Sequence, residues 1–153
     1  MASLDKVDEM LRSIIESYQC PKFETMPWVD GPPLNKRRIA LVSTAGLHRR
    51  DDRPFEDMSS EYRIIPGAIR ANDLIMSHIS TNFDRTGFEQ DWNIVFPLDR
   101  LKELAEQGTI GSVADFHYSF MGATDATQME PMARNLAKLL IRGKVNGVLL
   151  VPV

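Results

Sequence analysis

The chain has 153 residues, of which 43% are hydrophobic and 25% are charged, a composition typical of one globular domain and not of a disordered segment. Its formal net charge of −3 gives no reason to expect nucleic acid or a membrane as a partner. No apolar stretch reaches the ~18 residues of a transmembrane helix, and the N-terminus lacks the apolar core of a signal peptide. The single cysteine, Cys20, excludes an internal disulfide. We therefore expect a cytoplasmic protein without a dithiol redox centre.

The N-terminal part of the chain predicts a helix followed by a proline-rich arm. Apolar residues recur at helical spacing between residues 3 and 19, and Pro21 should end the helix. Prolines recur through residues 21–33 and favour an extended connection, which could lie on the domain surface or clasp a partner subunit. We assign residues 1–36 to this helix and arm, and residues 37–153 to an α/β domain.

Three strands are candidates in the first half of that domain. Residues 37–44 form an unbroken apolar run, typical of the middle of a parallel sheet. Residues 62–66 predict a second strand. Residues 74–80 could form a strand or a short helix, because seven residues do not settle the periodicity.

The second half alternates between helix and strand. Residues 98–108 predict a helix that ends on a glycine, and residues 112–122 predict a strand. The next helix should begin with a capping box formed by Thr127 and Glu130 and end at Gly143. This order, with short connections, indicates an α/β fold with a mostly parallel sheet flanked by helices, a Rossmann-like three-layer arrangement.

The final segment, VNGVLLVPV at residues 145–153, is apolar and β-branched and predicts a buried strand. The helix that should follow this strand is missing, so we expect the domain to be incomplete at its C-terminus. An apolar strip near residues 148–153 should then be covered by a neighbouring chain or by the N-terminal arm. We accordingly expect a homo-oligomer.

The three histidines lie at or near the ends of predicted strands. If these strands are parallel, His48, His78 and His117 could converge at one sheet edge, where acid–base or metal chemistry would be placed. Their spacing matches no common metal-binding motif. Hydrogen bonding to the backbone or to acidic neighbours is the favoured interpretation, and we predict no metal site.

Two glycine turns and one long polar segment could also carry function. The turns at Gly46 and Gly122 could present backbone N–H groups to an anion, although neither has a nucleotide-binding fingerprint and a plain turn is favoured. The polar segment 77–97 contains Asp84 and is long enough to be functional.

These segments together resemble the selenoprotein B family of glycine, sarcosine, betaine and D-proline reductases. The resemblance is carried by RIALVSTAGLHRRDDRPF, YRIIPG, DLIMSHISTNFDRTGFEQDWNIVFPLDRLKELAEQGTIGSVADFHYSFMGAT and VNGVLLVPV, which cover most of residues 37–153. The resemblance implies a selenocysteine, or a cysteine in its place, immediately after Val153. Because selenocysteine is encoded by UGA, otherwise a stop codon, we expect that the reading frame was ended at that codon.

The resemblance also implies an activity and partners for the full-length protein. The reaction class is reductive cleavage of a C–N bond in an amino acid or its N-methylated derivative. It takes place in a complex that contains a pyruvoyl-bearing subunit and receives electrons from a thioredoxin-like donor. The chain itself would then hold no catalytic residue and no cofactor, and would be inactive alone. Residues of the matching segments that are candidates to border the site are Thr44, Gly46, His48, His78, Asp84, His117, Ser119 and Gly122. The alternative is a complete α/β module that binds a small ligand or serves in assembly without catalysis.

Overall fold

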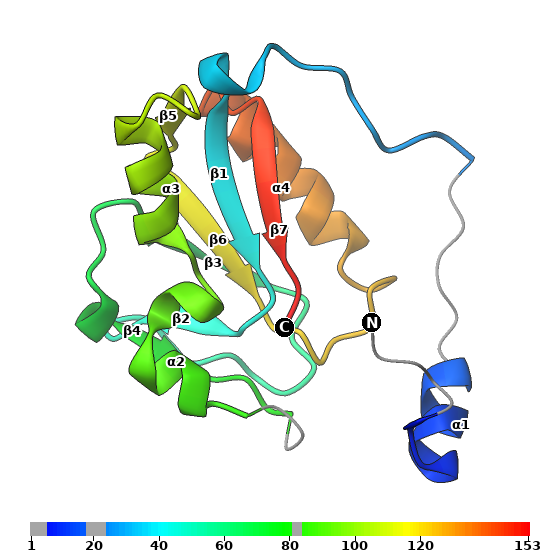
Figure 1. Cartoon of the computed structure of the whole chain (residues 1–153). Helices are drawn as coiled ribbons and strands as arrows, with labels where there is room; N and C mark the ends of the chain where they lie inside the picture. Colours follow the sequence, from blue (N-terminus) through cyan, green and yellow to red (C-terminus); the bar gives the residue numbers. More distant parts are fainter. Residues whose placement is uncertain (1–5, 18–23, 81–83) are drawn as a thin grey trace.

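The structure is a computed structural model that describes residues 6–17, 24–80 and 84–153 (Figure 1). The N-terminal helix α1 (Glu9–Ser17) lies within the predicted helical range. Both predicted ends of that helix, and the proline expected to end it, lie outside the described residues. In the arm that follows, Met26 and Trp28 are exposed, so these two side chains are not packed on the domain.

The main sheet is built around β1 (Arg38–Ser43), in agreement with the predicted strand 37–44. On one side β1 pairs in parallel with β7 (Gly147–Val151), and on the other side with β5 (Ser112–Val113) and β6 (Phe116–Phe120). Strand β3 (Tyr62–Pro66) has the predicted bounds but pairs antiparallel with β6. The sheet is therefore mixed. The α/β class is confirmed, whereas the mostly parallel Rossmann-like layout is not.

A second, two-stranded sheet lies beside the first. Strand β2 (Leu47–Arg49) pairs antiparallel with β4 (Leu74–Met76), so the segment that could have been a strand or a helix begins as a strand. Short helical turns connect these elements: η2 (Leu34–Lys36), η3 (Ala71–Asp73), α2 (Thr86–Gln90) and η4 (Trp92–Ile94).

Two longer helices pack against the main sheet (Figure 1). Helix α3 (Leu98–Glu106) supplies Leu98 and Leu101 to the larger core cluster, which also contains Leu41 of β1. Helix α4 (Glu130–Arg142) packs on a second cluster around Val42. Because neighbouring side chains of a strand point to opposite faces, Leu41 and Val42 place the two clusters on opposite faces of β1.

Helix α4 ends at Gly143 as predicted, but the predicted capping box is wrong. The helix begins at Glu130 without a side-chain cap. The Thr127 hydroxyl instead donates to the Asp125 carboxylate at 2.7 Å, and the Thr127 N–H donates to the same oxygen at 2.8 Å. The local turn at Asp125 therefore occupies the hydroxyl that the capping box would need.

Strand β7 forms where it was predicted, but it is not buried. Val148, Leu149 and Leu150 are 42%, 38% and 69% exposed. Within the described part of the chain β7 pairs with β1 alone, so its other edge and much of its apolar surface face outward.

No helix of the described residues is long and apolar enough to cross a membrane.

Candidate functional site

The carboxyl ends of β1 and β7 are joined by a threonine. The Thr44 hydroxyl oxygen accepts a hydrogen bond from the Val153 N–H at 2.8 Å and lies 3.3 Å from the Val153 carbonyl oxygen, to which it donates. The Thr44 N–H continues the strand ladder by donating to the Val151 carbonyl at 3.1 Å. These bonds hold the chain after β7 against the end of β1, where Figure 1 shows the C-terminus.

Gly122, two residues after the end of β6, is the point where three groups converge. A Cβ atom at this residue would lie 2.6 Å from the Thr44 carbonyl oxygen and 2.8 Å from both the Val153 carbonyl oxygen and His78 Nε2. Any side chain would therefore clash with two backbone atoms and an imidazole ring. Glycine at this position lets the ends of three strands and the His78 ring come together.

A second glycine brings His78 to this place. Gly46 has a φ of +64°, and a Cβ atom on it would lie 2.9 Å from the backbone nitrogen of His78. The Gly46 N–H donates to the Phe120 carbonyl at 2.8 Å, and its carbonyl accepts from the Ser77 N–H at 2.9 Å. Gly46 thus connects the segment after β4 to the end of the main sheet.

His78 is buried at this edge and is held in its neutral form. His78 is only 4% exposed, and the Arg85 guanidinium donates a hydrogen bond to the His78 carbonyl oxygen. Burial, together with the positive charge of Arg85, lowers the pKa of His78 below its usual 6.5. His78 Nδ1 accepts a hydrogen bond from the Ser80 N–H at 3.2 Å, so Nε2 carries the hydrogen in the neutral ring.

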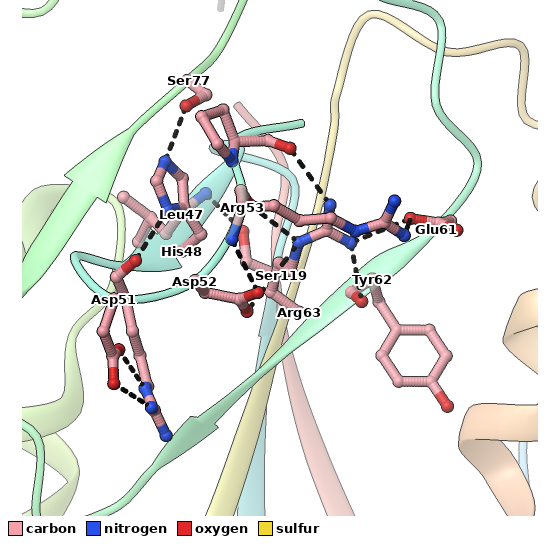
Figure 2. Close-up of polar contacts among 12 residues, drawn as sticks. Leu47, His48, Asp51, Asp52, Arg53, Glu61, Tyr62, Arg63, Ser77 and Ser119 are labelled. Atoms are coloured by element: carbon pink, nitrogen blue, oxygen red, sulfur yellow. Dashed lines mark hydrogen bonds and ion pairs between the residues drawn. The ribbon is translucent and has the colours of Figure 1, made fainter. Parts of the chain in front are cut away.

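His48 and Ser119 lie near this edge but are occupied by structural hydrogen bonds. The Nδ1–H of His48 donates to the Arg49 carbonyl and its Nε2 accepts from the Ser77 hydroxyl, both at 2.8 Å (Figure 2). The Ser119 hydroxyl oxygen accepts from the Leu47 N–H at 2.9 Å. Both side chains therefore hold β2 in place against the rest of the fold.

His117 and Asp84 do not join the cluster around Gly122. His117 lies five residues before Gly122 in an extended strand, which is roughly 16 Å at ~3.3 Å per residue. Its Nδ1 accepts from the Leu41 N–H at 3.0 Å, at the break between β5 and β6. Asp84 is exposed and accepts from the Thr86 N–H at 2.9 Å, and hydrogen bonds from Thr86 lower its pKa. The three histidines therefore do not converge at one edge.

In residues 6–17, 24–80 and 84–153, no three side chains of His, Cys, Asp or Glu come together as a metal-binding group. A pocket of about 360 Å³ is found near the amino ends of β1 and β6, at the other end of β6 from Gly122. It is lined largely by apolar side chains, and its Arg38 pairs with Asp115 at 2.8 Å. This pocket is thus separate from the cluster of strand ends.

Sequence reasoning missed Arg63, whose buried side chain supports the loop beside the cluster. Its guanidinium contacts the Glu61 carboxylate at 3.1 Å (Figure 2) and the Pro54 carbonyl at 3.2 Å. It also lies 4.4 Å from the centre of the Phe55 ring. The Thr124 hydroxyl, two residues after Gly122, donates to the Ser59 carbonyl of the same loop at 2.7 Å. An arginine in a short strand is expected to lie at the surface, so no pattern in the sequence indicated that Arg63 is buried.

Residues 15–153 match the family model described as "Glycine/sarcosine/betaine reductase selenoprotein B". The chain belongs to this selenoprotein B family.

Curated relatives of this selenoprotein B chain carry the names of reductase components. It is 33% identical over 122 residues to D-proline reductase subunit gamma of Acetoanaerobium sticklandii, covering 76% of this chain and 49% of the relative. It is 31% identical over 123 residues to betaine reductase complex component B subunit beta of Peptoclostridium acidaminophilum, covering 76% and 28%. The sarcosine reductase component B subunit beta of the same organism is 31% identical over 146 residues, covering 84% and 33%. The chain thus spans half or less of the length of these relatives. No solved structure matches it.

Proposed function

We propose that this chain is part of a selenoprotein B subunit of an amino-acid reductase that cleaves a C–N bond reductively in a substrate of the glycine, sarcosine, betaine or D-proline type. The observation that carries the proposal is the family match over residues 15–153. The names of the three relatives, which are components of D-proline, betaine and sarcosine reductases, support the reaction class.

We further propose that the redox residue of the full-length protein, selenocysteine or cysteine, stands directly after Val153. Support comes from the geometry of the strand ends: the parallel strands β1, β6 and β7 finish at Gly122, and ligands of α/β sheets bind outside the carboxyl ends of such strands. A chain that lacks this residue would be inactive in the proposed reaction. In this proposal, the full-length protein contains a selenocysteine that this chain does not include.

The proposal includes partners and a location. The betaine and sarcosine reductase relatives are both named as components of a reductase complex, which supports a multi-subunit assembly. The pyruvoyl-bearing subunit and the thioredoxin-like electron donor are proposed from the family resemblance. A homo-oligomeric state and a cytoplasmic location remain predictions from the sequence.

The test begins with the gene. We expect the codon after Val153 to be UGA, or a cysteine codon, followed by a frame that continues in the same family. The full-length protein should then support reduction of one of the four substrates when it is combined with its complex partners and a dithiol donor.

The matched control is the same full-length protein with serine in place of the redox residue, which should be folded but inactive. A UAA or UAG codon after Val153 would contradict the proposal. Saturable ligand binding by the 153-residue chain, without reductase activity in the extended protein, would favour the non-catalytic binding module.

A further inference from the structure

We infer that His78 is a hydrogen-bond donor to the redox side chain that follows Val153, and that its Nε2–H stabilises the thiolate or selenolate anion. This inference rests on the proposed function. It deepens that function by assigning a role to a residue of this chain.

The fold places His78 beside the point where the chain leaves β7. His78 Nε2 and the Val153 carbonyl oxygen both lie 2.8 Å from the same point above Gly122. The Cα atom of the next residue lies 3.8 Å from that of Val153, because this is the spacing across a trans peptide bond. A short side chain on that residue can therefore reach the space beside Nε2. The Thr44 hydroxyl, bonded to the Val153 N–H at 2.8 Å, fixes the direction in which the chain leaves β7.

The tautomer of the His78 ring makes Nε2 a hydrogen-bond donor. Nδ1 accepts from the Ser80 N–H, so the neutral ring carries its hydrogen on Nε2, the nitrogen that faces Gly122 and the end of β7. A neutral donor stabilises an anion over the whole pH range in which the ring is neutral. A charged imidazolium would do so only below its own pKa.

The charge near the His78 ring favours an anion. The Arg85 guanidinium donates to the His78 carbonyl, and its positive charge favours an anion nearby. The other residues shown to converge here, Thr44, Gly46, Gly122 and Val153, have no charged side chains. Among the described residues named here, His78 supplies an N–H donor and Arg85 a positive charge that would act on a new anion.

The position of His78 constrains the residues that lie around it. Gly46 and Gly122 are both needed for the approach of His78, one against its backbone and the other against its ring. A histidine that only filled space would not require Nε2 to face the ends of β1 and β7. The arrangement is typical of a side chain that is aimed at a particular place.

The experiment measures the acidity of the redox thiol without any substrate. The full-length protein, with cysteine directly after Val153, is alkylated with iodoacetamide across a pH series. The peptide that carries this cysteine is followed by mass spectrometry, which separates it from Cys20. We expect its thiol pKa to lie below the usual value of about 8.5. His78→Leu removes the donor and should raise that pKa by about one unit, which is about tenfold slower alkylation at a pH below both values.

Two further variants make the result specific. His78→Gln keeps an N–H group near the position of Nε2 and should restore most of the lowered thiol pKa. His48→Gln changes a buried histidine that is bonded to Ser77 and Arg49, and should leave the thiol pKa unchanged. Equal thiol pKa values in the parent and His78→Leu proteins would overturn the inference.

A second measurement serves if His78→Leu does not fold. In the parent protein, the ¹⁵N resonance of His78 Nε2 should shift as the thiol loses its proton, while the ring stays neutral. A resonance that does not move would also overturn the inference. A thiol pKa that depends on His78, in a protein without reductase activity, would instead contradict the proposed function. An active reductase whose thiol ignores His78 would contradict this inference alone.

Discussion

Two buried histidines show how differently the same side chain is used in two regions of this molecule. His117 lies in the middle of the sheet, whereas His78 lies at the carboxyl ends of its strands. Both are almost fully buried, both have a lowered pKa, and both accept a backbone N–H at Nδ1. Burial and pKa therefore do not distinguish the surroundings of these two histidines. Their neighbours do.

His117 repairs a break in the sheet. Strand β1 pairs with β5 at its beginning and with β6 at its end, and the Leu41 N–H between these two pairings donates to the His117 ring at 3.0 Å. The side chain thus replaces a ladder hydrogen bond that the break at residues 114–115 removes. His78 does not replace a ladder hydrogen bond in this way, since its Nε2 faces the ends of β1 and β7.

Replacement of His117 should have the largest effect on stability. His117→Ala removes a fully buried ring that packs edge-on against Phe96, and it leaves the Leu41 N–H without its acceptor. We expect a loss of about 3 kcal/mol in the free energy of unfolding. Urea titration followed by circular dichroism measures it. His48→Ala is the control for removal of a buried ring. An equal or larger loss of stability in that variant would show that the hydrogen bond from Leu41 to His117 makes no additional contribution.

The pH dependence of stability should come next, and its sign follows from the same residue. Burial and the charges of Lys102 and Arg38 lower the pKa of His117 from 6.5 to about 4. The unfolded state therefore binds a proton more readily than the folded state between these two values. Stability is retained above pH 6.5 and falls as the pH is lowered toward 4.

The size of this pH effect is on the order of 3 kcal/mol, because each unit of pKa shift corresponds to ~1.4 kcal/mol. Urea titrations at pH 7 and at pH 4.5 measure it. His117→Asn keeps a polar side chain that does not titrate, so the part of the pH dependence that belongs to His117 should disappear. An unchanged pH profile in that variant would show that other groups cause the acid sensitivity.

The cluster at the strand ends can be tested by filling it. In Gly122→Ala, the new Cβ atom would lie 2.6 Å from the Thr44 carbonyl oxygen, closer than real Cβ contacts come. We expect a loss of about 2 kcal/mol and displacement of the His78 ring. The matched control is Gly143→Ala, where φ is −74° and the nearest atom would be 3.4 Å away. Thermal unfolding of both variants, with the His78 resonances in the NMR spectrum, distinguishes a local clash from a general cost of alanine.

The sequence predicts local elements of this protein better than their pairing. The bounds of β3 follow from its β-branched residues and from the glycine at residue 67. Its antiparallel direction depends on a contact with β6, more than fifty residues away, which no local pattern records. The exposure of β7 has the same origin, since an apolar strand is buried only if the rest of the fold covers it.

The candidate site follows the same division. Gly46 and Gly122 are visible in the sequence as glycines that follow strands, and His78 is visible as a titratable residue near a strand. Their meeting at one point is a property of the folded chain. Arg63 shows the opposite limit, because five of its six polar and aromatic partners come from the loop before β3, whose sequence is mostly polar.

The smallest expected effect concerns the bond that joins β1 to the chain after β7. Thr44→Val keeps the shape of the side chain but removes both hydrogen bonds to Val153. We expect a loss of about 1 kcal/mol in global stability, because a partly buried hydrogen bond contributes about this much. The Val153 amide should exchange its hydrogen faster than the amides inside β7, as NMR can measure. Thr109→Val, at an exposed residue after α3, should change neither quantity. If Val153 stays protected in Thr44→Val, the end of β7 is held by the strand ladder alone, and Thr44 does not direct the chain toward His78.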